Sequence, residues 1–105
     1  MKPECKDIIK VILPAVRASV AEVMRKKYGY SQEEIAKKLG VVQVAVSKYL
    51  HRRYSKEISK MRDYISERKL NSSVIESIIN GGRRHEIDNA IDELCDRLVA
   101  FRTAQ

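Results

Sequence analysis

The 105-residue sequence has few of the residues that bend or cross-link a chain: four Gly, two Pro, two Cys and no Trp. So little Gly and Pro argues against a turn-rich β fold, a collagen-like repeat and low-complexity disorder. No apolar run approaches the roughly 18 to 20 residues of a membrane span, and the N-terminus lacks the features of a signal peptide. We therefore expect an intracellular protein with no membrane partner and one all-α domain over residues 1–105.

The sequence also has little that indicates catalysis or metal binding. It contains no glycine-rich phosphate loop and no nucleophile beside a positioned base, and the acidic residues near the C-terminus fall along one expected helix. Cys5 and Cys95 stand ninety residues apart, which is not a metal-ligand spacing. We expect both cysteines to be free and buried, with a bridge between them as the alternative. The sequence therefore predicts no enzyme, no cofactor and no metal.

Positive charge is abundant and unevenly distributed. Lys and Arg outnumber Asp and Glu by 21 to 14, which gives a net charge of +7. Residues 1–28 carry +4, residues 29–62 carry +5 and residues 63–105 carry −2. A basic front part joined to a mildly acidic rear part favours contact with a polyanion such as nucleic acid through the first sixty residues.

Apolar spacing and capping residues divide the chain into helices. Pro14 is well tolerated in the first turn of a helix that we expect to reach Tyr28, with Gly29 as its C-terminal cap. Ser31, followed by Glu34 three positions later, has the spacing of a capping box. Further helices are expected at residues 32–39, 43–51, 55–68, 72–79 and 84–102.

The segment QEEIAKKLGVVQVAVSKYLH, residues 32–51, has the pattern of two short helices meeting at a corner. Gly40 supplies the positive φ that the corner needs, and Ala36 is small where the second helix crosses the first. The apolar positions that close the corner are Ile35, Leu39, Val41, Val46 and Leu50. A purely structural corner would need the same apolar residues, but it would not explain the polar side of the second helix.

This segment resembles the helix-turn-helix of phage repressors and related regulators, in which the second helix enters the major groove of DNA. Side chains opposite Val46 and Leu50 then face the bases: Gln43, Val44, Ser47 and Lys48. Gln pairs with adenine, Lys donates to guanine, Ser donates or accepts, and an exposed Val suits a thymine methyl group. The resemblance implies that Gln32 lies against a phosphate and braces Gln43.

Basic residues around the two helices are candidates for neutralising phosphates. As a set with Gln32, the predicted phosphate-binding residues are Lys37, Lys38, Arg52, Arg53 and Lys56. Each of them taken singly is equally well explained as a solvated surface charge. We therefore predict phosphate binding for these residues as a set.

A wider resemblance covers residues 4–53 and is carried by Cys5, residues 12–17, residues 28–32 and residues 43–50. These stretches are similar to archaeal transcriptional regulators whose DNA-binding domain also occurs in the archaeal thiamine-biosynthesis regulator. Val42 departs from the pattern, because the family commonly has a capping Thr or Ser there. We expect the start of the second helix to lack a cap, which typically costs ~1 kcal/mol. We carry over no effector sensing, because the ligand-binding domain of those regulators is not in this sequence.

The last predicted helix has heptad spacing over two repeats. The apolar residues on its stripe are Ile87, Ile91, Leu94, Leu98 and Phe101. We expect them to form a dimer interface, since a two-fold operator is the usual target of a short recognition helix. The alternative is that they complete the core of the monomer. Arg83 and Arg84, at the start of this helix, are not explained by the resemblance and are poorly placed for its dipole.

Together, these features predict an all-α phage-repressor-type helix-turn-helix core at residues 14–53, followed by C-terminal helices at residues 55–105. The predicted function is a sequence-specific, homodimeric transcriptional repressor that binds double-stranded DNA in the cytoplasm, associated with the nucleoid. The alternatives are a nonspecific or architectural DNA-binding protein and a protein-interaction module such as an antitoxin-like partner. RNA binding has little support, because the Tyr and Phe residues do not form a stacking platform.

Overall fold

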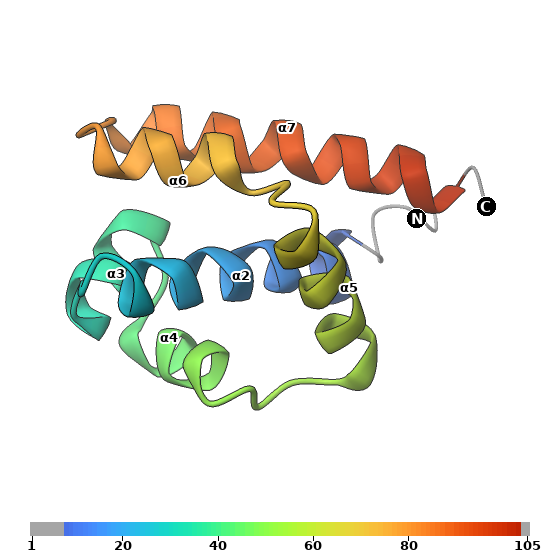
Figure 1. The fold of residues 1–105 in the computed structure, drawn as a ribbon, viewed down its shortest axis with the longest axis horizontal. Helices are drawn as coiled ribbons and strands as arrows, with labels where there is room; N and C mark the ends of the chain where they lie inside the picture. The colour runs from blue at the N-terminus through green and yellow to red at the C-terminus, as the bar shows by residue number, and fades with distance from the viewer. Residues whose placement is uncertain (1–7, 104–105) are drawn as a thin grey trace.

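The computed structural model describes residues 8–103, and within that range every regular element is helical (Figure 1). This confirms the predicted all-α fold. No helix among the described residues is long and apolar enough to cross a membrane. The elements are a π-helical turn η1 (Ile8–Ile12), α2 (Leu13–Lys26), α3 (Gln32–Leu39), α4 (Gln43–Leu50), α5 (Lys56–Glu67), α6 (Ser72–Ile79) and α7 (Arg84–Thr103).

Helix α2 starts one residue before the predicted position, because η1 runs directly into it and Pro14 falls in its first turn. It ends at Lys26, two residues before the predicted end at Tyr28. Gly29 then takes a left-handed conformation with φ 71°, and the backbone N–H of Tyr30 donates to the carbonyl of Met24 at 3.0 Å. The backbone N–H of Gly29 donates to the carbonyl of Arg25 at 3.2 Å, so the helix ends with an αL C-cap.

The predicted capping box at the start of α3 is present. The Ser31 hydroxyl accepts from the Glu34 backbone N–H at 3.1 Å, and the Glu34 carboxylate accepts from the Ser31 N–H at 3.0 Å. The hydrogen bond from the Ser31 backbone lowers the pKa of Glu34 from its ordinary value of 4.5. These paired bonds fix the first turn of α3 and the direction in which the chain enters it.

Helix α2 lies at the centre of the molecule (Figure 1). Helices α6 and α7 lie along one side of it, and α4 lies on the opposite side. Contacts with neighbours on several sides explain why α2 carries small residues, among them Ala15, Ala18 and Ala21, and why these are fully buried. The central helix thus holds the α3–α4 pair in place relative to the rest of the chain.

The stripe on α7 packs into the core of the chain itself. Ile87, Ile91, Leu94 and Leu98 are buried in the core that α2, α3, α5 and α6 share with α7. This corrects the expectation that the stripe forms a dimer interface, because a side chain already buried in its own chain offers no surface to a second copy. Phe101 differs: it is 40% exposed, and its ring stacks on that of Tyr64 with centroids 4.9 Å apart.

Cys95, on α7, is buried and forms no disulfide with any described residue. Burial, together with the nearby carboxylates of Asp92 and Asp96, raises the pKa of its thiol to about 11. Cys5 lies outside the described residues, so the alternative of a Cys5–Cys95 bridge stays untested. Cys95 is a protonated, inert thiol at neutral pH.

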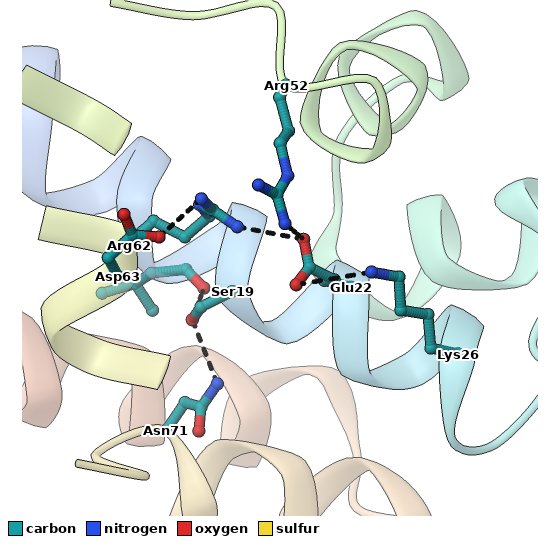
Figure 2. A network of polar contacts seen from close by, with 8 residues as sticks. Ser19, Glu22, Lys26, Arg52, Arg62, Asp63 and Asn71 are labelled. Atoms are coloured by element: carbon teal, nitrogen blue, oxygen red, sulfur yellow. Dashed lines mark hydrogen bonds and ion pairs between the residues drawn. The ribbon is translucent and has the colours of Figure 1, made fainter. Parts of the chain in front are cut away.

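A polar network connects α2 to α5 and to the segments that follow α4 and α5 (Figure 2). Asn71 donates to the Ser19 hydroxyl at 3.1 Å, and both side chains are buried. The guanidinium of Arg62, only 4% exposed, donates to Glu22 at 3.1 Å and pairs with Asp63. Glu22 also pairs with Arg52 at 3.5 Å. One carboxylate therefore bridges a buried and an exposed arginine, and it also pairs with Lys26 at 3.8 Å.

Candidate nucleic-acid interface

The corner between α3 and α4 has the predicted geometry. Gly40 has φ 68° and ψ 37°, a left-handed conformation that costs glycine little. The backbone N–H of Val41 donates to the carbonyl of Ala36 at 3.0 Å, which closes the end of α3. Ile35 and Leu39 are buried in the core beneath. The sequence therefore fixes both the turn and the faces that the two helices present inward.

Helix α4 buries one side and exposes the other. Val46 is fully buried, and Leu50, one turn later, is partly buried against the core. On the outward side, Gln43 and Lys48 are exposed and Val44 is 65% exposed, whereas Ser47 is half-buried. The four predicted base-contacting residues thus lie where a ligand can reach them.

The start of α4 has no side-chain cap, as the departure at Val42 predicts. Val42 is the N-cap residue, and its side chain makes no capping hydrogen bond. It is 70% exposed, so two branched apolar side chains, Val42 and Val44, stand in solvent within three residues of one another. Neither contributes to the chain's own core, and both are therefore available to an apolar group of a ligand.

Ser47 and His51 interact at the end of α4. The Nδ1 atom of His51 lies 2.8 Å from the Ser47 carbonyl oxygen and 3.4 Å from the Ser47 hydroxyl. When Nδ1 carries the proton it donates to the carbonyl, and the hydroxyl of Ser47 then keeps its own proton for another acceptor. His51 itself is exposed.

The predicted phosphate-binding residues lie around this corner but differ in their present partners. Gln32 occupies the first position of α3 and is half-buried. Lys37 is exposed and pairs with Glu33 at 3.7 Å, one turn earlier on α3. Exposed ion pairs of this kind contribute ~0.3 to 0.5 kcal/mol, so a phosphate can replace the partner at little cost.

Three of the remaining basic candidates follow α4 directly. Arg52 and Arg53 are exposed in the loop after the helix, and Lys56 is exposed at the first turn of α5. Arg52 has a positive φ of 57° and is paired with Glu22 on α2. The last candidate, Lys38, is half-buried near the end of α3. The structure thus places basic side chains before α4, in the last turn of α3, and after α4, in the loop and the first turn of α5.

The positions of Glu22 and Arg84 beside the α3–α4 unit are not indicated by the sequence pattern. Glu22 orients Arg52 from a distance of thirty residues along the chain. Arg84 lines a groove of about 710 Å³ together with Gly40, Val42 and Gln43. No spacing pattern links Glu22 to Arg52, or Arg84 to Gly40, because these residues are far apart in the sequence. The one local signal is the Arg84–Asp88 pair on α7, which has the i, i+4 spacing of a helical ion pair.

No group of three or more His, Cys, Asp or Glu side chains among residues 8–103 could hold a metal ion. The chemistry of the α3–α4 unit is instead that of hydrogen-bond donors, cations and two exposed valines around a short helix.

A family model described as helix-turn-helix matches residues 23–63, which span the end of α2, all of α3 and α4, and most of α5. Residues 23–63 are a helix-turn-helix domain. Neither a curated protein nor a solved structure matches the chain.

The helix-turn-helix family is a DNA-binding, regulatory family and not a catalytic one, so the match supports DNA binding by this protein. The match contains α3 and α4, which correspond to the two helices of the motif, and in such domains the second of these helices enters the major groove. The exposed residues of α4 therefore lie on the element that enters the major groove in such domains.

Proposed function

We propose that this protein is a sequence-specific transcriptional regulator that inserts α4 into the major groove of double-stranded DNA. The observation that carries the proposal is the two-sidedness of α4. Val46 is buried in the core and holds the helix in place. Gln43, Val44 and Lys48 are exposed and make no contribution to that core. A helix that only completed a core would not need this combination on its outward side.

The chemistry of these residues supports base recognition. Gln43, at the first position of α4, offers the donor and acceptor pair that matches adenine, and Lys48 donates to guanine. Val44 offers a methyl surface for thymine, and Ser47 keeps a hydroxyl for a further base or phosphate contact. Discrimination between base pairs then comes from one face of an eight-residue helix.

Phosphate contacts are proposed for Gln32 and for the basic residues on both sides of α4. Their side chains bring positive charge to the two ends of the recognition helix, where the strands bordering a major groove would run. These contacts orient the helix and add sequence-independent affinity that falls with salt. The proposed set beside Gln32 is Lys37, Lys38, Arg52, Arg53 and Lys56.

We further propose a homodimeric repressor that occupies a pseudo-palindromic operator, blocks polymerase and resides on the nucleoid. Two copies of α4 would double the contacts that one short helix makes. The pairing surface excludes Ile87, Ile91, Leu94 and Leu98, which are buried within the chain. Phe101 is the member of the α7 stripe that stays exposed. Membership of the archaeal regulator family described above stays a prediction, which is based on the sequence resemblance over residues 4–53.

Selection of bound fragments from random duplex DNA tests the proposal. We expect a consensus of two symmetric half-sites about one helical turn apart, and at least about 10³-fold tighter binding to it than to random DNA at physiological salt. One asymmetric half-site would retain specific binding and contradict the dimer.

Two other outcomes would contradict the proposed function. Binding with a steep salt dependence and no consensus would indicate a nonspecific or architectural DNA-binding protein. A folded protein that shifts no duplex at physiological salt would instead indicate a protein-interaction module.

A further inference from the structure

Arg84 reaches from the first residue of α7 to the corner of the helix-turn-helix. Although it lies outside the matched segment, its guanidinium occupies the space directly above Gly40. A Cβ atom built on Gly40 would lie 1.4 Å from Nη2 of Arg84 and 1.8 Å from its Cζ. The absence of a side chain at Gly40 therefore serves two purposes: it permits the left-handed turn, and it leaves room for the arginine.

The position of Arg84 is set from its own helix. Its Nε donates to the Asp88 carboxylate at 3.1 Å, one turn along α7. Ile87, between them in sequence, is buried in the core and anchors the start of α7 against α3. The backbone of α7 is thus fixed near the corner, and the planar guanidinium extends over it while its side chain stays 51% exposed.

The same groove contains the beginning of the recognition helix. Arg84 lines it with Gly40, Val41, Val42 and Gln43. The N-cap Val42 makes no side-chain hydrogen bond, so the start of α4 lacks one of the restraints that commonly fix a helix terminus. The guanidinium of Arg84 lies over the turn that precedes this uncapped terminus.

The charge around Arg84 is compatible with both a mechanical role and a phosphate contact. The nearby lysines Lys37 and Lys38 are accompanied by Glu33 and Glu34, and Arg84 is itself paired with Asp88. Because exposed pairs of this kind exchange partners at little cost, the placement of the guanidinium over Gly40, and not the local charge, favours a mechanical role.

We propose that Arg84 is a positioning residue, which braces the α3–α4 turn and thereby sets the direction in which α4 projects Gln43 toward DNA. Through this contact the C-terminal helices take part in sequence specificity. The inference rests on the proposed function, since it assumes that α4 contacts bases. It assigns a role in DNA recognition to a residue far outside the helix-turn-helix.

The test compares Arg84→Lys and Arg84→Ala with the neighbouring Arg83→Ala. Arg84→Lys keeps the charge but not the planar group above Gly40, whereas Arg83→Ala removes one exposed charge from the same place. Arg83 takes part in α7 through its backbone N–H, which donates to Glu86, so the substitution leaves that bond intact. Each full-length variant is titrated with the selected operator and with a random duplex at two salt concentrations.

We expect both Arg84 variants to reduce the ratio of operator to random-duplex affinity by roughly 2- to 30-fold, with little change in affinity for random DNA. Arg83→Ala should change both affinities by the same factor and leave the ratio intact. Thermal melting confirms that the variants are folded. In the free protein, Arg84→Lys should also shift the backbone amide resonances of residues 41–44, and Arg83→Ala should leave them in place.

Failure of the inference and failure of the proposed function give different results. A wild-type protein without preference for any duplex overturns the proposed function, and this inference with it. A wild-type protein with a clear preference that Arg84→Lys leaves unchanged overturns the inference alone. Equal losses on both duplexes in Arg84→Ala that are restored in Arg84→Lys would also overturn it, because they would assign Arg84 to a phosphate contact.

Discussion

Helices α4 and α6 have the same length and opposite uses. Each has eight residues, and neither has a side-chain cap at its N-terminus. In α6, Val74 and Ile78 are buried one turn apart, whereas in α4 only Val46 is buried. The difference shows that apolar content alone does not decide where a helix goes, because α4 is also rich in valine and leaves Val44 exposed.

The same contrast separates the front and rear parts of the chain. The rear helices α6 and α7 direct most of their apolar residues into the common core and therefore support stability, while Ile79 and Phe101 stay partly exposed. The α3–α4 unit uses the core for one face and leaves the other free for a ligand. Substitutions in the two parts should accordingly change different measured quantities.

The largest effect is expected from a buried residue of α7. Leu94→Ala should reduce the free energy of unfolding by about 3 kcal/mol, because it leaves a cavity in the core. Val44→Ala should change it by less than about 0.5 kcal/mol. Urea denaturation measures both values. A large loss of stability in Val44→Ala would remove the distinction between the two parts of the chain.

The next largest effects should distinguish residues that contact bases from residues that contact phosphates. Gln43→Ala should cost ~1 to 3 kcal/mol of binding free energy on the preferred site and much less on random DNA. Arg52→Ala should weaken binding to all sequences alike and lower the dependence of affinity on salt. Competition titrations give both quantities. Since Arg52 also pairs with Glu22, the exposed Arg53 offers a second variant for the phosphate arm. Uniform losses in both Gln43→Ala and Arg52→Ala would contradict this division of roles.

A smaller effect is expected from restoring the missing cap of α4. Val42→Ser should raise the free energy of unfolding by up to ~1 kcal/mol, because a hydroxyl could accept from a free N–H in the first turn. Ser31→Ala, which removes half of the existing capping box of α3, should lower it by a similar amount. Thermal or urea unfolding measures the pair. A Val42→Ser variant less stable than the wild type would show that the exposed valine has a structural role.

The last effect concerns Cys95 and is confined to alkaline pH. Because the pKa of the folded thiol is raised to about 11 from 9.0, the unfolded thiol loses its proton first as pH rises. The contribution to stability is therefore complete below about pH 9 and declines as pH rises toward 11. In a Cys5→Ser background, alkylation of Cys95 at pH 8 should be at least roughly 100-fold slower in the folded protein than in urea. Equal rates would show that Cys95 is accessible.

Local features of the fold were predictable from the sequence. The capping box of Ser31 and Glu34 and the turn at Gly40 each depend on residues a few positions apart, and both occur as expected. The outward placement of Gln43 and Lys48 follows from the helical period once Val46 is assigned to the core. These steps need only local spacing and one buried face.

Contacts between distant residues were not predictable in this way. Heptad spacing in α7 is equally suited to a partner helix and to the chain's own core, and only the packing of α2 and α6 against it decides between them. Arg84 meets Gly40 because two elements far apart in sequence converge, and no period in the sequence records that convergence. The same heptad pattern can therefore lie at a dimer interface or in the core of the monomer.

The ion-pair network around Glu22 has a consequence for the loop after α4. Arg62 is enclosed by the protein and retains Asp63 as well as Glu22, whereas Arg52 is held by Glu22 from the solvent side. Arg52 can therefore swing from the carboxylate to another anion without leaving the interior guanidinium of Arg62 uncompensated. The loop after α4 thus carries a cation that can change partners while the buried ion pairs of Arg62 stay in place.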